Sequence, residues 1–287
     1  MPIRNPVEWS VEKARVAAQA VGASAVEVQR AESIEHPVAP AIARIGLADL
    51  RAALVKGWED FGAARSDVML LCLFYPAIGL VLGRFASGED TMPLLFPLIS
   101  GFALIGPIAS VGLYEMSRRR ELGAKIGWGD AFAVLRLPGF GSIVLLGLIL
   151  GLIFVLWLIA AQGIYDLTLG PDHTATFGGF AQDVLHTHGG HQLIVFGVGT
   201  GFLFAVVVLT IGVVSVPMLV DRGCGLNVAV QTSMRAVAAN PGAMATWGLI
   251  VAAALVLGSI PLFLGLVVVI PVLGHATWHL YRRVVLR

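Results

Sequence analysis

Long stretches of the chain contain no Asp, Glu, Lys or Arg. They cover residues 68–83, 91–114, 137–165, 192–220 and 236–281. A helix needs about 20 mostly apolar residues to cross the hydrocarbon core of a bilayer. The last stretch would be roughly 70 Å long as a single helix, so it is predicted to be a hairpin that turns at Gly258-Ser259-Ile260-Pro261. The pattern therefore predicts an all-α polytopic membrane protein with six transmembrane helices in three hairpins.

An amphipathic segment precedes the first predicted span. Its apolar residues recur at spacings of three and four, which places them along one side of a helix: Leu47, Leu50, Leu54, Trp58 and Phe61. We expect this helix to lie in the cytoplasmic interface of the membrane, with Trp58 as an anchor. Similar segments at 128–136 and 226–237 precede the third and fifth predicted spans. The chain is thus predicted to repeat one unit three times, a surface helix followed by a membrane hairpin.

The distribution of Lys and Arg predicts the orientation of these spans. From the N-terminus to the C-terminus, the segments outside the spans contain eight, one, five, none, two, none and three such residues. Cytoplasmic loops are enriched in Lys and Arg, so both termini are expected in the cytoplasm. Only 13% of the residues are charged, about half the proportion of a soluble protein.

Two parts of the chain are distinguished. Residues 1–40 form a predicted cytoplasmic N-terminal extension, and residues 41–287 form the six-helix membrane domain. No apolar core of a signal peptide occurs in the first 30 residues, so the first span is expected to act as the targeting signal. Cys72 and Cys224 form no metal or redox motif and are expected to be unpaired thiols. No basic run is interleaved with aromatic residues, so nucleic acid is not an expected partner.

Four separated blocks near the predicted cytoplasmic helix ends carry a family resemblance. They are Gly112–Glu121, Ser215–Arg222, the group Ser233–Val237 with Asn240–Gly242 and Trp247, and Gly274–Arg282. Together they resemble a bacterial family of predicted six-span integral membrane proteins, domain of unknown function 2189, over roughly residues 40 to 285. The resemblance implies a bacterial inner-membrane protein and supplies no activity.

Histidines concentrate in the predicted third loop, which contains no Lys or Arg. Neutral imidazoles are good ligands of zinc and copper. In an extended segment His186 and His188 would share a face, Gly189-Gly190 could fold His191 back, and His173 or Asp183 could complete the set. The sequence thus offers a metal site at His186, His188 and His191. The alternative is a solvated, glycine-rich loop that merely tolerates histidine.

Two further histidines lie near the cytoplasmic end of the sixth predicted span. His275 and His279 are four residues apart and so share one helix face. Ionisable groups in membrane segments suggest a functional site. The simpler interpretation is an interfacial belt that the two imidazoles share with Trp278, Tyr281 and Arg282.

No catalytic motif is present, so the chain is not expected to be an enzyme or to bind a cofactor. Glu115 and Asp221, which end the second and fourth spans, are expected to pair with nearby arginines. The first functional interpretation is a non-catalytic structural, assembly or accessory component that contacts lipid and a membrane-protein partner or a second copy of itself. The alternatives are a transporter or channel for a neutral or amphipathic small molecule, using proline-broken helices, and a metal-handling membrane protein.

Overall fold

The described part of the chain is helical. The computed structural model describes residues 40–63, 97–98, 106–108, 110–170, 177–261 and 263–286. Within these ranges the one extended pairing is an isolated bridge between Ile42 and Val285. The helices are α2 (Leu47–Ala63), α6 (Val111–Glu121), the 3-10 helix η2 (Trp128–Arg136), α7 (Phe140–Thr168), α8 (Phe177–His186), α9 (His188–Gly212), α10 (Ser215–Arg222), α11 (Leu226–Ala239), α12 (Pro241–Ser259) and α13 (Leu266–Val284). The predicted all-α class is confirmed.

Three of the described helical runs are long and apolar enough to cross a membrane. They are α7, the run His188–Arg222 formed by α9 and α10, and α12. Helix α13 is not among them, because its second half carries His275, His279 and two arginines. The first two predicted spans lie largely outside the described residues. The count of six spans therefore stays a prediction.

The predicted turn in the last apolar stretch is confirmed. Helix α12 ends at Ser259 and α13 begins at Leu266, so the stretch folds back on itself. The helices approach closely at the turn because Gly258 and Gly265 face one another. A Cβ atom on Gly265 would lie 2.8 Å from the Cα of Gly258. Glycine at both positions is what permits this contact.

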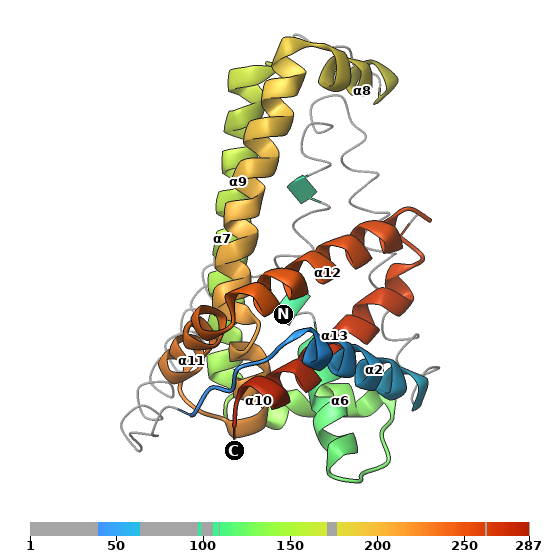
Figure 1. The fold of residues 1–287 in the computed structure, drawn as a ribbon, viewed down its shortest axis with the longest axis vertical. Coiled ribbons are helices and arrows are strands. Elements are labelled where there is room, and N and C mark those ends of the chain that lie inside the picture. The colour runs from blue at the N-terminus through green and yellow to red at the C-terminus, as the bar shows by residue number, and fades with distance from the viewer. Residues whose placement is uncertain are drawn as a thin grey trace, which may run out of the picture.

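The long helices α7 and α9 form an antiparallel pair that rises away from the rest of the molecule (Figure 1). Trp157 of α7 fills the space left by Gly201 of α9 and packs against Phe204. Its indole N–H donates to the carbonyl oxygen of Pro97 at 3.1 Å, so the buried donor is satisfied. Helix α8 covers the far end of this pair (Figure 1).

The opposite end of α7 and α9 is formed by α2, α6, η2, α10, α11 and residues 274–284 of α13, which we call the polar end (Figure 1). The second and fourth predicted loops and the C-terminal tail all lie at this end, whereas the third predicted loop lies at the other. All three predicted surface segments are helical, the middle one as a 3-10 helix. The described parts of the second, third and fourth loops and of the tail thus alternate between the two ends (Figure 1), while which end faces the cytoplasm stays a prediction.

A break separates α9 from α10. Its cause is Pro217, whose ring would clash with the carbonyl of Val213 in a continuous α-helix. Ser233 of α11 bridges the break: its hydroxyl donates to the carbonyl of Thr210 at 2.7 Å and accepts from the N–H of Val214 at 3.3 Å. The hydroxyl of Ser215 donates to the carbonyl of Ala229. Ser233 and Ser215 thus tie α11 to the chain at the break.

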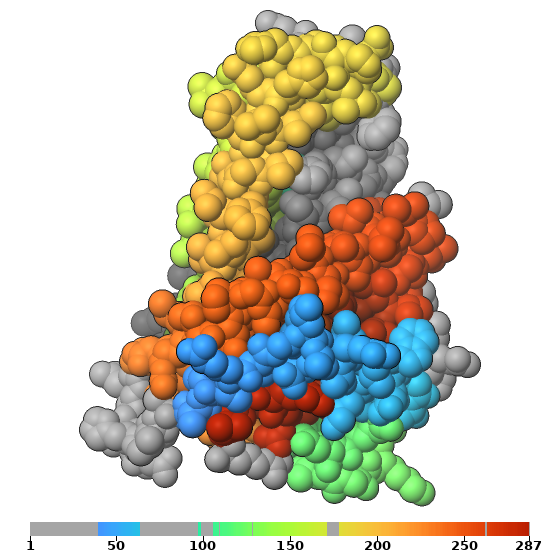
Figure 2. Space-filling model, in the orientation of Figure 1, coloured from blue at the N-terminus to red at the C-terminus, as the bar shows by residue number. Residues whose placement is uncertain are grey.

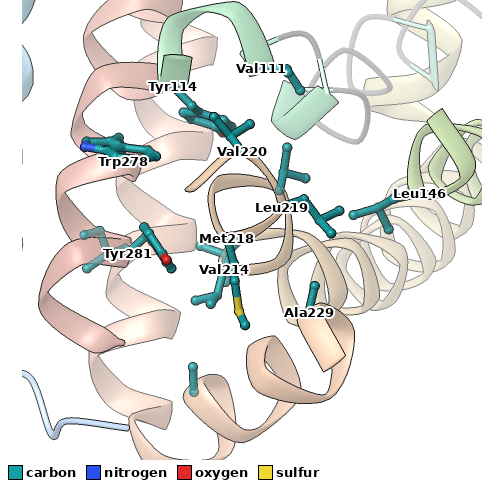
Figure 3. Close-up of a cluster of buried hydrophobic side chains, with 14 of the residues drawn as sticks. Val111, Tyr114, Leu146, Val214, Met218, Leu219, Val220, Ala229, Trp278 and Tyr281 are labelled. Atoms are coloured by element: carbon teal, nitrogen blue, oxygen red, sulfur yellow. The ribbon is translucent and has the colours of Figure 1, made fainter. Parts of the chain in front are cut away.

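Buried apolar side chains around α10 form the centre of the polar end. Figure 3 shows residues from α6, α7, α10, α11 and α13 meeting there: Val111, Tyr114, Leu146, Val214, Met218, Leu219, Val220, Ala229, Trp278 and Tyr281. Six of the eight residues of α10 are buried, and the two that reach solvent, Asp221 and Arg222, lie at its end. Helix α10 is therefore the element on which the others converge.

Helix α2 packs on α13 with a face that differs in part from the predicted apolar stripe. Leu50 and Phe61 are buried, as the stripe predicted, but Leu47 and Trp58 remain exposed. The buried face is completed by Gly57, where a Cβ atom would lie 2.6 Å from the backbone nitrogen of Ala276. Part of the predicted stripe therefore contacts α13, and the other part lies on the exposed side of α2. Whether the exposed side meets lipid stays a prediction.

The segment before α2 is tied to two distant parts of the chain, as Figure 2 shows it crossing the surface from the α11–α12 junction towards α13. The side chain of Asn240 accepts from the N–H of Ile45 at 2.8 Å and donates to the carbonyl of Ala43 at 3.0 Å. The N–H of Ala43 also donates to the carbonyl of Val284. These bonds fix where α2 begins.

The contact at Gly57 yields a stability prediction. Gly57→Ala is expected to destabilise the folded protein by about 1–3 kcal/mol, because the added methyl group would force α2 off the backbone of α13. Gly62→Ala on the same helix meets nothing within 4 Å and is expected to be neutral or to stabilise by up to about 1 kcal/mol through helix propensity. Denaturant unfolding in one detergent measures both. Equal midpoints for the two variants would contradict close packing at Gly57.

Candidate functional site

A group of buried polar side chains joins three helices at the polar end. Asp60 comes from α2, Ser117 and Arg120 from α6, and His275 and His279 from α13. Asp60, Ser117 and His275 are almost fully buried, and His279 is nearly so. We call this group the Asp60 cluster.

The helices come close enough for these short side chains to meet because two glycines lie at the crossings. Gly57, one turn before Asp60, allows α2 onto α13. Gly274, beside His275, allows α13 onto α6, where a Cβ atom would lie 2.7 Å from the side chain of Leu113. The positions of the polar residues are therefore set by backbone contact.

The Asp60 carboxylate accepts hydrogen bonds from three side chains. Its Oδ2 atom accepts from the hydroxyl of Ser117 at 2.6 Å and lies 2.8 Å from Nε2 of His279. Its Oδ1 atom accepts from the guanidinium of Arg120, which also forms an ion pair with it. A buried charge is tolerated when it is paired and hydrogen-bonded in this way.

The hydrogen bonds of Asp60 determine the proton position on His275. Since the carboxylate can only accept, the Ser117 hydroxyl donates to it, and the Ser117 oxygen is left to accept from Nδ1 of His275 at 2.7 Å. The hydrogen of neutral His275 is thus on Nδ1, and its Nε2 carries a lone pair. Nε2 is buried and has no hydrogen-bond partner among the described residues.

The charge state of Asp60 follows from two opposing effects. Burial alone would raise the pKa of this carboxyl, but the hydrogen bonds from His279 and Ser117 and the nearby imidazoles outweigh it, so the pKa lies below its usual value of 3.8. Asp60 is therefore ionised at neutral pH.

At Cys224, in the loop after α10, burial raises the pKa to about 11, so this residue is a thiol rather than a reactive thiolate.

A second set of ion pairs surrounds the Asp60 cluster. Glu115, which is fully buried, accepts two hydrogen bonds from Arg118 and one from Arg119. Arg119 also reaches Asp130 of η2 at 2.7 Å and so joins η2 to α6. The expected pairing of Glu115 with arginine is confirmed.

The other predicted carboxylate is also paired. Asp221 of α10 accepts from the hydroxyl of Tyr281 at 2.7 Å and from Arg282 at 3.3 Å. Arg282 in turn lies 3.1 Å from Glu121 at the end of α6. These contacts connect α13 to α10 and α6, and they confirm the structural interpretation of Asp221.

The interfacial belt predicted for the sixth span is wrong. His275, Trp278, His279 and Tyr281 are buried within the protein and do not lie at its surface. The reason is that α2 and α6 cover this face of α13. The sequence interpretation missed Asp60 and Ser117, the partners of the two imidazoles. The sequence did contain a signal for Asp60. This residue follows Gly57 by three positions, so the two share one side of the helix, and a glycine on that side indicates close packing.

The predicted metal ligands lie at the other end of the molecule and are not gathered. The expected extended segment is helical instead: His186 ends α8 and His188 begins α9, with Thr187 between them as the N-cap of α9. His186 is close to the carbonyl of Gln182, and His191 to that of Leu185. His173 lies outside the described residues. Among the described residues no three His, Cys, Asp or Glu side chains are placed to hold a metal ion, so metal binding stays a prediction.

The helical fold and its long apolar helices define an α-helical integral membrane protein. Residues 95–221 match the family model of a predicted integral membrane protein, domain of unknown function 2189 (DUF2189). The resemblance drawn from the sequence blocks is thus confirmed over that range, and the blocks that begin at Ser233 and Gly274 lie beyond it. No curated protein and no solved structure gives a significant match.

Removal of the Asp60 charge yields a second prediction. Asp60→Asn is expected to lower the free energy of unfolding by about 1–3 kcal/mol at neutral pH, because it leaves Arg120 without its counter-ion and weakens a buried network. Asp49→Asn is the matched control on the same helix. Asp49 forms a half-exposed pair with Arg283, and its loss is expected to cost about 0–1 kcal/mol.

The same pair of variants predicts a pH dependence. Because the folded-state pKa of Asp60 is below 3.8, its contribution to stability is fully present above that value. It is lost as the pH falls from 3.8 through the lower folded-state pKa. The stability difference between wild type and Asp60→Asn should therefore shrink over this acid range, as measured by unfolding at a series of pH values. A difference that grew on acidification would show that Asp60 is protonated in the native protein.

Proposed function

We propose that this chain is a non-catalytic integral membrane protein of the bacterial inner membrane that acts as a structural, assembly or accessory component. The observation that carries the proposal is the Asp60 cluster. A buried carboxylate whose three donors come from two neighbouring helices, α6 and α13, serves to hold α2 against them. Asp221 of α10 is likewise bonded by Tyr281 and Arg282 of α13. Glu115 pairs with Arg119 of its own helix, and Arg119 continues to Asp130 of η2. The ionic groups of the polar end are used to join helices.

The surface of the polar end supports a role in contacts with other molecules. Each of the three surface helices presents a large apolar side chain to the outside: Trp58 of α2, Phe132 of η2 and Met234 of α11, each about half exposed or more. An exposed basic residue accompanies each of them on the same helix, namely Lys56, Arg136 and Arg235. Such surfaces suit the membrane interface or a membrane-protein partner.

The transport alternative receives less support from the proline-containing helices. A transporter of this kind would expose the backbone groups of a broken helix to its substrate. At the break before α10, the hydroxyl of Ser233 occupies the groups of Thr210 and Val214. The metal-handling alternative also receives less support, because no three His, Cys, Asp or Glu side chains of the described residues are grouped to hold a metal ion.

The proposed orientation places the polar end in the cytoplasm. Arginines cluster there, whereas residues 166–191 at the other end contain no Lys or Arg. This asymmetry is the one expected of a bacterial inner-membrane protein. Reporter fusions after Lys125, Gly225 and Leu286 are expected to show cytoplasmic activity, and a fusion after Asp172 periplasmic activity. A cytoplasmic signal from the Asp172 fusion would overturn the orientation.

The functional proposal is tested by purifying the tagged full chain from its native membrane in lipid nanodiscs. The expected result is a complex of fixed stoichiometry, with a second protein or a second copy, which Trp58→Glu weakens and the matched control Glu59→Gln leaves intact. Proteoliposomes containing the protein should show no more flux of neutral solutes than empty vesicles. A monomer that supports saturable flux would refute the proposal and favour the transporter.

A further inference from the structure

His275 carries an acceptor atom that the rest of the structure does not use. Its Nδ1–H is held by Ser117, which fixes the ring, and its Nε2 is buried without a donor among the described residues. Buried polar atoms in native proteins almost always have a partner, so an exception calls for an explanation such as an exchangeable ligand. Because the hydrogen bond with Ser117 fixes the ring, this lone pair points in a defined direction.

The charged groups that face His275 come from three helices. Helix α2 contributes Asp60, helix α6 contributes Arg120, and α13 itself contributes His279. Helix α12 contains no ionisable residue, and Asp221 of α10 is bonded to Tyr281 and Arg282 instead. Asp60 is therefore the one facing carboxylate among the described residues, and Ser117 connects it to the imidazole.

We propose that Asp60, Ser117, His275 and His279 form a proton-binding site, with Nε2 of His275 as the open acceptor and Asp60 as the counter-ion. This site goes beyond the proposed structural role and does not depend on it. A metal ion would need further ligands, and none are grouped there among the described residues. A proton needs only one lone pair and a compensating charge.

The hydrogen bonds connect the bound proton to its counter-ion. When a proton binds Nε2, the imidazolium of His275 keeps donating from Nδ1 to the oxygen of Ser117, and the Ser117 hydroxyl keeps donating to Oδ2 of Asp60. The positive charge on His275 is thus compensated by the ionised Asp60 through one hydroxyl group. His279, which also bonds Oδ2, adds a second imidazole to the cluster, slightly more exposed than that of His275.

Nitrogen NMR of histidine tests the site directly. The full chain, labelled with ¹⁵N-histidine, is studied in nanodiscs, and His275→Gln assigns the signals. Near neutral pH, wild type is expected to show His275 with its hydrogen on Nδ1 and a bare Nε2 that becomes protonated on acidification. In Ser117→Ala the ring loses its oriented acceptor, and the population should shift towards the tautomer with hydrogen on Nε2.

The counter-ion role is tested by a matched pair of variants. Asp60→Asn is expected to weaken proton binding at His275 by about tenfold or more, the usual effect of removing one nearby opposite charge. Asp49→Asn on the same helix should leave it unchanged. A wild-type His275 already protonated on Nε2 and bare on Nδ1 would overturn the proposal, as would equal titrations in the two aspartate variants. Should Asp60→Asn fail to fold, the tautomer shift in Ser117→Ala decides the matter.

Discussion

The ionised carboxylate of Asp60, enclosed by three helices, is the interaction on which the polar end depends. An ion away from water is costly unless donors surround it, and these donors come from α6 and α13. Apolar contact alone holds membrane helices weakly, because lipid chains are as apolar as leucine. The Asp60 carboxylate receives these hydrogen bonds only when α2, α6 and α13 are packed together. Lipid chains have no donors that could replace them.

The carboxylate can act in this way only because the backbones are close. An aspartate side chain is short, so α2 must approach α13 near Gly57, and α13 must approach α6 near Gly274. The clamp of Asn240 on residues 43–45 then sets the start of α2, and Arg283 holds Asp49 in its first turn. Packing and electrostatics are therefore linked: a wider helix spacing would break the hydrogen bonds, and their loss would remove the reason for the close contact.

The sequence predicted those features that depend on local pattern. Runs without charge predicted α7, α9 and α12, and the glycine and proline near residue 260 predicted the turn before α13. It did not predict the Asp60 cluster, because a pattern assigns polar residues to the surface, and the partners of Asp60 lie 57 and 219 residues further along the chain. The outer histidines are not gathered, for a local reason. Thr187 accepts the N–H of Gly190 and so starts a helix, where an extended segment was expected.

Helix α13 shows why composition alone is a poor guide to burial in this protein. Its second half is too polar to count as a spanning helix, yet its histidines, Trp278 and Tyr281 are more completely buried than most of α7 and α9. The apolar helices face outwards, where lipid replaces protein, while the polar helix is enclosed because its groups need partners that lipid lacks. The exposed side of α2 carries Leu47, Val55 and Trp58 together with the charged Arg51, Lys56 and Glu59. The helix is therefore amphipathic on the side that faces away from α13, while its buried charge, Asp60, is used within the protein.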